Sequence, residues 1–569
     1  MSMKRLLHFL AFLVPLIFMV LGCAKDNIVI IDPVSVEDSE DDISNTEFTQ
    51  TVYVEFSTSE NATVTGTDDD FMVTVNGNDV TIVYLGEEYV MYELSGVTGD
   101  GFFKLYSTKK QGITLKEVDI TNKNGAAINV QGTVSEPSKG KRTFIVLKGD
   151  NSLADGVSYT DTPSTEDEKA VLFGEGQFVF SGTGRLIVTA TGKSGITSDD
   201  YVHFCSGTVE VFSSAGHGVR GKDYIRVSDG TIVVSTSADM KKGFISDGYV
   251  VIDGGNTSIN VTGGTAYDSE DGEYTSSAGI KADRYFRIND GALGIVNAGT
   301  GGKGISCDGN AYFYGGSVEV YAQGSNYGSG GSGFHSGNNN SNSVSAKGIK
   351  CDGNLLFTGG RVIVNSVAHE AIEAKGSITV TDGEVMAISQ SDDAINSGGD
   401  FTISGGYVYG FSAGNDGLDS NGNFYIKGGV VFATGSSSPE VAIDANTEGG
   451  YKLYLTGGTL IAIGGLERGS SLTQSCYSAS SWSQDTWYAL TVGSKIYAFR
   501  TSSSGGTPLV VSGASMPTLQ SGVDITEGTS YFEYWLFEDP TVSGGTSVSL
   551  SSYTGGNGGG PGGGGGGPH

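Results

Sequence analysis

The sequence predicts an all-β protein whose chain winds as a parallel β-helix, with a small β segment packed on its C-terminal end. Three observations favour this fold class. Glycine makes up 90 of the 569 residues, or about 16%, roughly twice its ordinary share. Short runs of Val, Ile, Tyr, Phe and Thr recur between glycine turns, whereas long amphipathic helical stretches are missing. A unit of about 23 residues also repeats along the chain.

Composition indicates a folded protein and excludes one class of partner. Hydrophobic residues make up 38% and aromatic residues 10% of the chain, which is too many for a disordered protein. The 64 Asp and Glu outnumber the 33 Lys and Arg, for a net charge of −31. Such a surface repels phosphate backbones, so no nucleic-acid partner is expected. It also repels acidic polysaccharides unless a divalent cation or a local basic patch intervenes.

Residues 1–22 are expected to be a lipoprotein signal peptide rather than part of the fold. Lys4 and Arg5 precede an apolar run over 6–20. The run leads into Val-Leu-Gly and Cys23, which resembles the lipobox of bacterial lipoproteins; the alternative is an ordinary signal peptide with a chance cysteine. A lipid on Cys23 would attach the protein to a membrane. We therefore expect a bacterial cell-envelope location, as an outer-membrane or cell-surface lipoprotein, with residues 23–47 as an acidic tether.

The regular repeat spans 191–465, and residues 48–190 are expected to form less regular coils that cap it. Each coil of a parallel β-helix bonds to the coils above and below at about 4.8 Å, so equivalent residues of successive units become vertical neighbours. One apolar anchor per unit is expected in the core: Ile196, Val219, Phe244, Ile280, Ile305, Ile349, Ile372, Ile395, Leu418 and Ile443. The residue two positions after each anchor is always small: Ser198, Gly221, Ser246, Ala282, Cys307, Cys351, Ala374, Ser397, Ser420 and Ala445.

Two cysteines lie in this column of small residues, on neighbouring coils. Stacked Cβ atoms at a spacing of about 4.8 Å are farther apart than the roughly 3.8 Å that a disulfide prefers. The sequence therefore predicts that Cys307 and Cys351 are buried free thiols.

One column of outward-facing residues in the last coils is apolar: Ile363, Met386, Tyr409, Phe432 and Ile461. Such a patch should not face water. We expect the segment 466–555, which contains Trp482, Trp487 and Trp535, to cover it. The alternative is a stripe on which sugars stack. The glycine-rich tail 556–569 is expected to be disordered.

Charged residues beside the anchors change from basic to acidic between the coil of Lys347 and the coil of Glu370. Stacked carboxylates repel one another, and Ca²⁺ offsets such repulsion because it accepts six to eight oxygen ligands. The sequence predicts calcium on one edge, with the ligands Glu370, Glu373, Asp392, Asp393, Asp416, Asp419 and Asp444. The alternative is solvated acids that bond to the backbone of their own turns.

The basic side of this boundary is the candidate carbohydrate site. Lys347 is expected over Glu370 and Lys350 over Glu373, either as ion pairs between coils or as cations that meet a uronate carboxylate. Tyrosines can pack against sugar rings, although surface tyrosines are equally common on ordinary sheets. The predicted carbohydrate-binding residues are Lys303, Lys347, Lys350, Tyr312, Tyr314 and Tyr425.

A catalytic role is disfavoured. Lyase chemistry needs an uncharged Lys near the sugar, whereas each candidate Lys has an expected carboxylate neighbour that keeps it protonated. No catalytic residue is assigned, and the six histidines suggest neither a zinc pair nor a catalytic triad.

Several stretches resemble a bacterial family of carbohydrate-binding β-helix lipoproteins, typified by a clostridial cellulose- and pectin-binding protein. The matching residues are 125–128 (Gly-Ala-Ala-Ile), the turns 391–395 and 415–419, the Ile-Ser-Gly-Gly and Ile-Lys-Gly-Gly strands, and the Gly-Pro tail. The resemblance implies a right-handed parallel β-helix of polysaccharide-lyase-like fold, bound calcium, and a cellulose- or pectin-type ligand without established catalysis. We expect a monomer that binds extracellular polysaccharide. The alternatives are a calcium-dependent polysaccharide lyase and an adhesin or structural surface protein without a glycan ligand.

Overall fold

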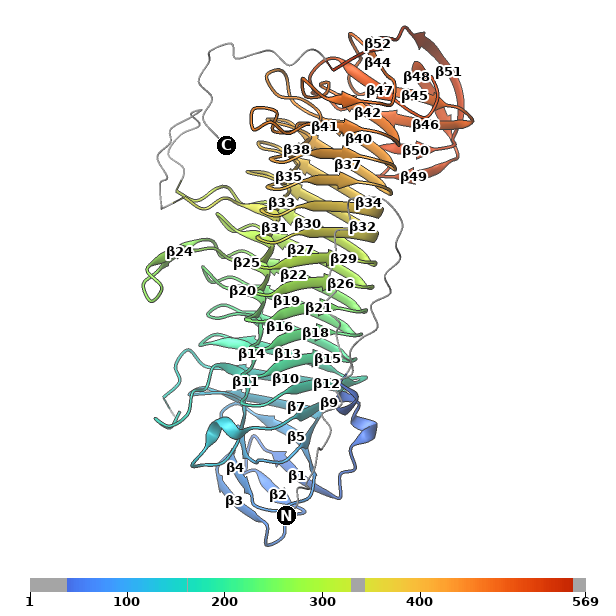
Figure 1. Cartoon of the computed structure of the whole chain (residues 1–569). Helices are drawn as coiled ribbons and strands as arrows, with labels where there is room; N and C mark the ends of the chain where they lie inside the picture. Colours follow the sequence, from blue (N-terminus) through green and yellow to red (C-terminus); the bar gives the residue numbers. More distant parts are fainter. Residues whose placement is uncertain (1–37, 161, 329–342, 556–569) are drawn as a thin grey trace, which may run out of the picture. The chain divides into compact units, whose positions relative to one another are not determined.

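A computed structural model describes residues 38–160, 162–328 and 343–555 (Figure 1). The signal peptide, Cys23, most of the acidic tether and the glycine-rich tail lie outside these residues. The chain divides into two compact units, Met1–Asn45 and Thr46–His569. In the first unit, the described residues form two short 3₁₀ helices, η1 (Ser39–Asp41) and η2 (Ile43–Asn45). None of the helices in the described residues is long and apolar enough to cross a membrane.

The second unit consists of stacked strands, as the all-β prediction requires. Each regular repeat contributes one strand to a 14-stranded sheet (sheet 1) and two strands to a 30-stranded sheet (sheet 2). Each strand pairs in parallel with its equivalents in the preceding and following repeats, so the repeats form successive coils (Figure 1). Sheet 1 consists of β3 (Phe71–Asn76), β4 (Asp79–Tyr84), β6 (Phe102–Tyr106), β8 (Ile128–Gln131), β11 (Ala170–Gly174), β14 (Ser194–Ser198), β17 (Val219–Gly221), β20 (Lys242–Ser246), β25 (Ala278–Ala282), β28 (Lys303–Cys307), β31 (Lys347–Cys351), β33 (Ile372–Ala374), β35 (Ile395–Ser397) and β38 (Leu418–Ser420).

Sheet 2 contains two rows of strands, and β5, β7, β32 and β34 extend through both. The first row is β1 (Gln50–Phe56), β5 (Val90–Thr98), β7 (Gln111–Asn122), β9 (Thr143–Lys148), β12 (Phe178–Gly182), β15 (Tyr201–Phe204), β18 (Tyr224–Val227), β21 (Tyr249–Ile252), β26 (Tyr285–Ile288), β29 (Asn310–Phe313), β32 (Leu355–Ser366), β34 (Ile378–Ser389), β36 (Phe401–Ile403), β39 (Phe424–Ile426), β41 (Leu453–Leu455) and β43 (Ser471–Leu472). The second row adds β10 (Asp150–Asp155), β13 (Arg185–Ala190), β16 (Thr208–Ser213), β19 (Thr231–Thr236), β22 (Asn256–Val261), β27 (Ala292–Asn297), β30 (Ser317–Ala322), β37 (Tyr407–Ser412), β40 (Val430–Thr434) and β42 (Thr459–Ile463).

Smaller elements join these rows. The strand β2 (Thr63–Thr65) pairs with β1, and β47 (Leu509–Ser512), β44 (Cys476–Ala479) and β52 (Ser551–Tyr553) extend sheet 2 in antiparallel fashion. A short helix, η3 (Pro137–Lys139), precedes β9, and a hairpin of β23 (Ala266–Asp268) and β24 (Glu273–Thr275) projects between β22 and β25. A six-stranded antiparallel sheet (sheet 3) contains β49 (Thr529–Tyr531), β50 (Leu536–Glu538), β46 (Lys495–Arg500), β45 (Trp487–Val492), β48 (Thr518–Thr526) and β51 (Thr541–Val548).

The apolar anchors form a continuous column in sheet 1, as the repeat predicts. Ile196 pairs with Val219, Val219 with Phe244, and the register continues through Ile395 and Leu418 to Ile443. All ten anchors are at most 1% exposed. Burial of each anchor contributes roughly 1.5–3 kcal/mol, so the periodic sequence specifies both the register and the core.

The glycine turns follow from the close stacking of the coils. Gly316 has a φ of +71°, a conformation that side chains with a Cβ rarely adopt. A Cβ on Gly316 would also lie 2.6 Å from the carbonyl oxygen of Gly291 on the preceding coil. A side chain is therefore excluded by both backbone conformation and space.

The C-terminal segment covers the apolar column on the last coils, and this prediction is confirmed. Ile363, Met386, Tyr409, Phe432 and Ile461 are at most 1% exposed and share a core with residues of sheet 3. Phe432 meets the ring of Phe499 edge-on at 5.5 Å, and Tyr409 stacks on Trp535 at 6.3 Å. The alternative that this column is a sugar-stacking stripe is wrong, because its side chains are buried by protein.

The predicted free thiols are confirmed as well. Cys307 and Cys351 are register partners in β28 and β31, and both are buried and free. Each sulfur is close enough to donate to a backbone carbonyl: Cys307 Sγ to that of Asn310 at 3.3 Å, and Cys351 Sγ to that of Gly309 at 2.8 Å.

Candidate functional site

The predicted charged residues lie along one edge of sheet 1, in the turns and first residues of successive strands. Lys303 is the register partner of Lys347. Lys350 pairs in register with Glu373, Glu373 with Asn396, and Asn396 with Asp419. The coil stack therefore places basic residues next to acidic ones at the predicted boundary.

At that boundary, Lys347 forms ion pairs with two carboxylates. Its Nζ lies 2.6 Å from Glu373 Oε2 and 3.1 Å from Glu370 Oε2. Burial disfavours the charged Lys347, but the charges and hydrogen bonds of Glu370 and Glu373 outweigh burial and raise its pKa. The Lys347–Glu370 ion pair matches the prediction.

The expected pairing of Lys350 with Glu373 is wrong. Lys350 Nζ lies 2.6 Å from Asp352 Oδ2 on its own coil. Glu373 instead binds Lys347, and this pairing occupies the carboxylate that was predicted as a calcium ligand. Backbone register aligns the Cα atoms of Lys350 and Glu373, but the direction of each side chain selects a different partner.

Lys303 lies at the basic end of this edge and differs from the other lysines. Its Nζ approaches Ser276 Oγ at 3.1 Å and the carbonyl of Gly301 at 3.4 Å. Burial, followed by repulsion from Lys350 and Lys347, lowers the pKa of Lys303 to about 7. The expectation that a carboxylate keeps every candidate lysine charged is therefore wrong for Lys303.

The predicted metal ligands do not form one site, because their coils separate them into two clusters. The first cluster contains His369, Glu370 and Asp392, with donor atoms within 4.8 Å of one another. His369 Nδ1 lies 2.9 Å from Asp392 Oδ2 and also contacts Glu370 Oε2. Burial disfavours the charged imidazole, but hydrogen bonds with Asp392 and Glu370 outweigh it and raise the pKa of His369 to about 9.

The second cluster contains only carboxylates. Oxygens of Asp416, Asp419 and Asp444 lie within 4.8 Å of one another, and Asp416 is 8% exposed. Burial, then repulsion from Asp416 and Asp419, raises the pKa of Asp444 to about 10. Burial likewise raises the pKa of Asp416 to about 8, although a hydrogen bond from the Val441 amide opposes this shift.

Asp393 lies between the clusters and belongs to neither. One of its carboxylate oxygens accepts the amide of Asp416 at 3.1 Å, and the other accepts Asn396 Nδ2 at 3.1 Å. The side chain thus bonds to the turn of the next coil and is buried, whereas the alternative interpretation expected solvated acids that bond to their own turns.

The predicted tyrosines lie on the first row of sheet 2, away from the strands that carry the lysines. Tyr312 is 5% exposed, and its ring contacts Tyr285 and Tyr314 at centroid distances of 6.3 and 5.9 Å. Tyr425 stacks on Tyr454 at 5.1 Å. The lysines and tyrosines therefore do not combine into one carbohydrate site.

A tyrosine ladder on the same row was missed in the sequence. Tyr201, Tyr224, Tyr249 and Tyr285 are register partners, and successive rings stack at 4.2, 4.7 and 4.7 Å. The sequence signal is an Asp one residue before Tyr201 and Tyr224 and two residues before Tyr249 and Tyr285. Because the rings cover one another's faces, the ladder holds coils together rather than offering ring faces to sugars.

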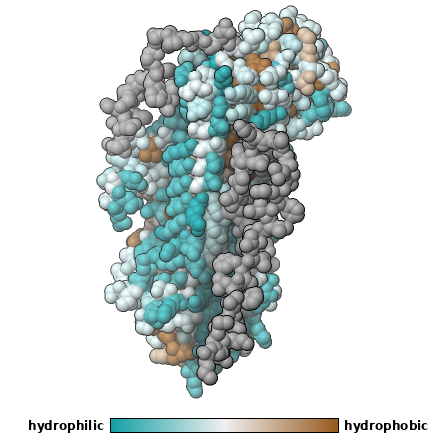
Figure 2. All heavy atoms as spheres, in the orientation of Figure 1, coloured by the Kyte–Doolittle hydropathy of each residue, from teal (hydrophilic) through white to brown (hydrophobic). Residues whose placement is uncertain are grey.

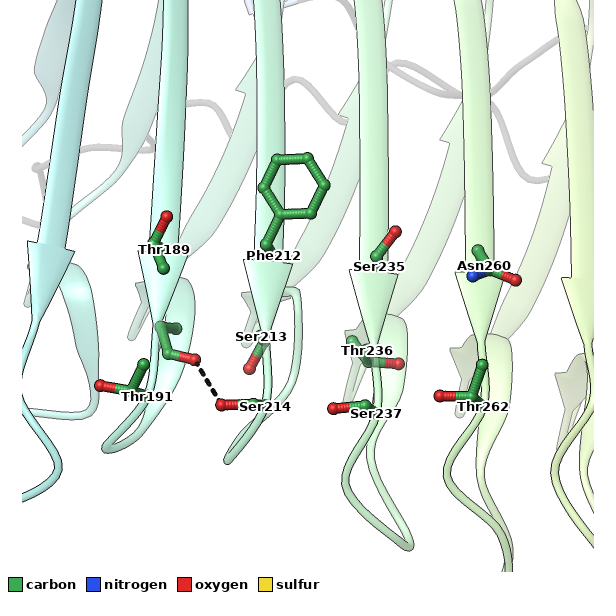
Figure 3. Close-up of a pocket in the computed structure, with 11 residues that line it drawn as sticks. Thr189, Thr191, Phe212, Ser213, Ser214, Ser235, Thr236, Ser237, Asn260 and Thr262 are labelled. Carbon is green, nitrogen blue, oxygen red and sulfur yellow. Dashed lines mark hydrogen bonds between the residues drawn. The ribbon is translucent and has the colours of Figure 1, made fainter.

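The second row of sheet 2 carries an open groove that was also missed (Figure 3). It has a volume of about 270 Å³. Thr189, Phe212, Ser235 and Asn260 form its first column through the register of β13, β16, β19 and β22. The remaining lining residues are Ala190, Thr191, Ser213, Ser214, Thr236, Ser237 and Thr262. The sequence signal is the series of strand ends Thr-Ala, Phe-Ser, Ser-Thr and Asn-Val on four consecutive coils, each followed within one residue by Ser or Thr.

The groove is uncharged, and its exposed lining is more apolar than polar. None of its lining residues is charged, although the chain carries a net charge of −31. Phe212 is 41% exposed and stands above the row of hydroxyl side chains (Figure 3). The visible face of the coils is mainly hydrophilic (Figure 2). Ser213 and Thr236 are buried. The groove therefore combines one exposed aromatic face with the outward hydroxyl groups of its other Ser and Thr residues.

The comparison with family models indicates a carbohydrate-related role. The model of a family described as carbohydrate-binding domain-containing protein matches residues 76–248, 237–326 and 294–394. A polysaccharide lyase-like protein from C. thermocellum, solved as a gadolinium derivative, is 21% identical with a TM-score of 0.36, over 48% of this chain and 96% of that one. A search of curated proteins finds no match. Because the family matches together span residues 76–394, more than half of the chain, this protein belongs to the carbohydrate-binding domain-containing family.

Proposed function

We propose that this protein is a lipid-anchored cell-surface protein that binds an extracellular polysaccharide along the coils of a right-handed parallel β-helix. Family membership supports a carbohydrate ligand. The observation that carries the proposal is the groove of Figure 3, with exposed Phe212 among hydroxyl side chains on four successive coils.

The chemistry of the groove favours a neutral glycan over a uronate polymer. Ser and Thr hydroxyls donate and accept hydrogen bonds, as sugar hydroxyls do. An exposed aromatic ring packs against the C–H face of a sugar. A uronate would need cations to offset its charge, whereas the groove contains none. A cellulose-type glucan is therefore the ligand class that the groove fits.

Affinity electrophoresis tests this site. The wild-type protein should be retarded in gels that contain hydroxyethyl cellulose, and Phe212→Ala should lose most of that retardation. Tyr451→Ala is the matched control, because Tyr451 is 42% exposed on a loop several coils away. Equal retardation of the wild type and Phe212→Ala would exclude the groove, and retardation by polygalacturonate alone would exclude a neutral ligand.

Calcium at the Asp416–Asp419–Asp444 cluster is the second part of the proposal. The donor set fits Ca²⁺, because it is made of carboxylate oxygens within 4.8 Å of one another and Ca²⁺ prefers oxygen ligands. Burial is the main cause of the raised pKa values of Asp416 and Asp444, and repulsion from neighbouring carboxylates adds to it; a divalent cation would offset this repulsion. These residues would hold the ion and thereby stabilise the last coils.

Calorimetric titration with CaCl₂ tests the cluster. Wild-type protein should bind Ca²⁺ and gain about 2.7 kcal/mol of stability at a free concentration of 100 times the dissociation constant. Asp444→Asn should lose both the heat of Ca²⁺ binding and the gain in stability. Asp382→Asn, at an exposed position of β34 where the carboxylate accepts the Gly383 amide, should keep both. The absence of heat from the wild type would exclude this calcium site.

One observation favours a second candidate function, a polysaccharide lyase. The pKa of Lys303 is lowered to about 7, so an uncharged amine is available to remove the proton at C5 of a uronate while the bond from C4 to its oxygen breaks. Incubation with polygalacturonate should then produce unsaturated ends that absorb ultraviolet light, and Lys303→Ala should abolish this. No increase in absorbance would exclude the lyase.

The lipid anchor rests on the sequence pattern at Cys23. Metabolic labelling with a radioactive fatty acid should mark the wild-type protein and leave Cys23→Ser unlabelled. Equal labelling of the two, or no labelling of the wild type, would contradict a lipid at this position.

A further inference from the structure

We infer that His369, Glu370 and Asp392 form a second cation site, which selects a d-block divalent ion such as Zn²⁺ rather than Ca²⁺. The site lies at the start of β33 and β35, in the turns that enter sheet 1. It is separate from the calcium cluster and from the groove. Its defining feature is an imidazole nitrogen beside two carboxylates, with all three donor atoms within 4.8 Å of one another.

The spacing of the donor atoms suits a small ion. In a tetrahedral site with bonds of about 2.1 Å, two ligand atoms lie roughly 3.4 Å apart. His369 Nδ1 and Asp392 Oδ2 are 2.9 Å apart, and the whole set stays within 4.8 Å. Small rotations of these side chains would therefore bring the three ligands around one ion, with a water at the fourth position.

The local charge also matches a divalent cation. Lys347 contributes +1, and Glu370, Glu373 and Asp392 contribute −1 each, so the sum with a neutral imidazole is 1 − 3 = −2. A divalent ion offsets all of this charge.

Neighbouring groups hold the ligands in place. Asn415 Nδ2 donates to Asp392 Oδ1 at 3.0 Å, which leaves Oδ2 directed at His369. Ser389 Oγ donates to the carbonyl of His369 at 3.0 Å, and Lys347 Nζ fixes Glu370 at 3.1 Å. Such outer contacts orient metal ligands, and their loss typically costs about 10–100-fold in metal affinity.

The donor chemistry separates the two cation sites. Imidazole nitrogen with carboxylate oxygen suits Zn²⁺ and related d-block ions, whereas Ca²⁺ prefers an all-oxygen shell of six to eight ligands. The cluster of Asp416, Asp419 and Asp444 offers oxygen only. The same edge of sheet 1 thus presents two sites of different metal preference on successive coils.

Titration of the full chain, without a polyhistidine tag and after treatment with a chelator, tests this inference. CoCl₂ should produce visible absorption bands that ZnCl₂ abolishes stoichiometrically. His369→Gln should lose the Co²⁺ absorption bands and bind Zn²⁺ more weakly by about tenfold or more. It should still release the heat of Ca²⁺ binding in the calorimetric titration. Asp392→Asn should also weaken Zn²⁺ binding, and His203→Gln should behave as wild type.

Two results would overturn the inference. One is the absence of Co²⁺ bands in the wild type, which does not depend on any variant folding correctly. The other is unchanged Zn²⁺ affinity in a His369→Gln protein whose far-ultraviolet circular dichroism matches the wild type. Because Asp444→Asn alters only the calcium cluster, it should lose Ca²⁺ binding and keep the Co²⁺ bands. A wild-type protein that shows Co²⁺ bands but no Ca²⁺ heat would contradict the calcium proposal alone, and one with Ca²⁺ heat but no Co²⁺ bands would contradict this inference alone.

Discussion

Lys347 Nζ lies 2.6 Å from Glu373 Oε2 on the next coil, and the two side chains are only 12% and 17% exposed. The same ammonium lies 3.1 Å from Glu370 Oε2, whose side chain is 7% exposed. One lysine therefore compensates two shielded carboxylates at the boundary between the basic and acidic coils. Removal of one partner from such a pair is costly, because it leaves an uncompensated buried charge.

Replacement of Lys347 by Met should destabilise the protein by about 3–5 kcal/mol, since Glu370 and Glu373 would lose their cation. Urea unfolding followed by circular dichroism measures this as a lower midpoint. Lys116→Met is the control: its pair with Glu93 is exposed, at 53% for the lysine, and should cost less than about 1 kcal/mol. Similar midpoints for the two variants would show that the Lys347 pairs are solvated.

Lys303→Met should stabilise the protein near neutral pH, and the gain should vanish in alkali. The pKa of Lys303 is about 7 in the folded protein, below its ordinary value of 10.5, because burial and then Lys350 and Lys347 disfavour its charge. Between these two pH values the unfolded chain binds a proton that the folded protein does not. Wild-type stability therefore falls as pH decreases from 10.5 to 7, by up to about 1.4 kcal/mol per pH unit, and stays at its lower level below pH 7.

Urea unfolding of wild type and Lys303→Met at several pH values between 6 and 11 measures this dependence. The difference in unfolding free energy should be largest at and below pH 7. A constant difference across the whole range would show that the folded-state pKa of Lys303 is not lowered.

Phe432→Ala should loosen the C-terminal segment from the coils. Phe432 is fully buried and stacks on Tyr409 at 4.5 Å, so the cavity should cost about 3–5 kcal/mol. Limited proteolysis should cut the variant faster within 480–550. Phe212→Ala, at an exposed position, should change stability by less than about 0.5 kcal/mol. Equal proteolysis of the two variants would contradict a packing role for Phe432.

The thiols should differ in reactivity within the folded protein. Cys205 is partly exposed, whereas Cys307, Cys351 and Cys476 are buried. Hydrogen bonding to Cys307, then burial, raises the pKa of Cys351, which removes the reactive thiolate. Iodoacetamide should therefore modify Cys205 first, and Cys351 only after denaturation, as peptide mass spectrometry will show. A peptide that links Cys307 to Cys351 would contradict the free-thiol state.

Sequence periodicity predicted the parts of this protein that depend on register. A 23-residue unit with an apolar anchor and a small residue two positions later leaves one arrangement that buries every anchor, so Ile372, Ile395 and Leu418 had to become neighbours. The cover over Phe432 followed from the same reasoning, because an outward apolar column cannot remain in water.

The tertiary structure alone decided which charged and polar side chains meet. Register fixes the Cα neighbours, but the direction of each side chain made Lys350 bind Asp352 rather than Glu373, and placed His369 between Glu370 and Asp392. The groove beside Phe212 likewise required the outward sides of four strands to be seen together. Hydrophobic burial is non-directional and can be inferred from a periodic pattern, whereas ion pairs, metal ligands and hydroxyl-lined surfaces depend on distances of a few ångströms that a one-dimensional repeat does not contain.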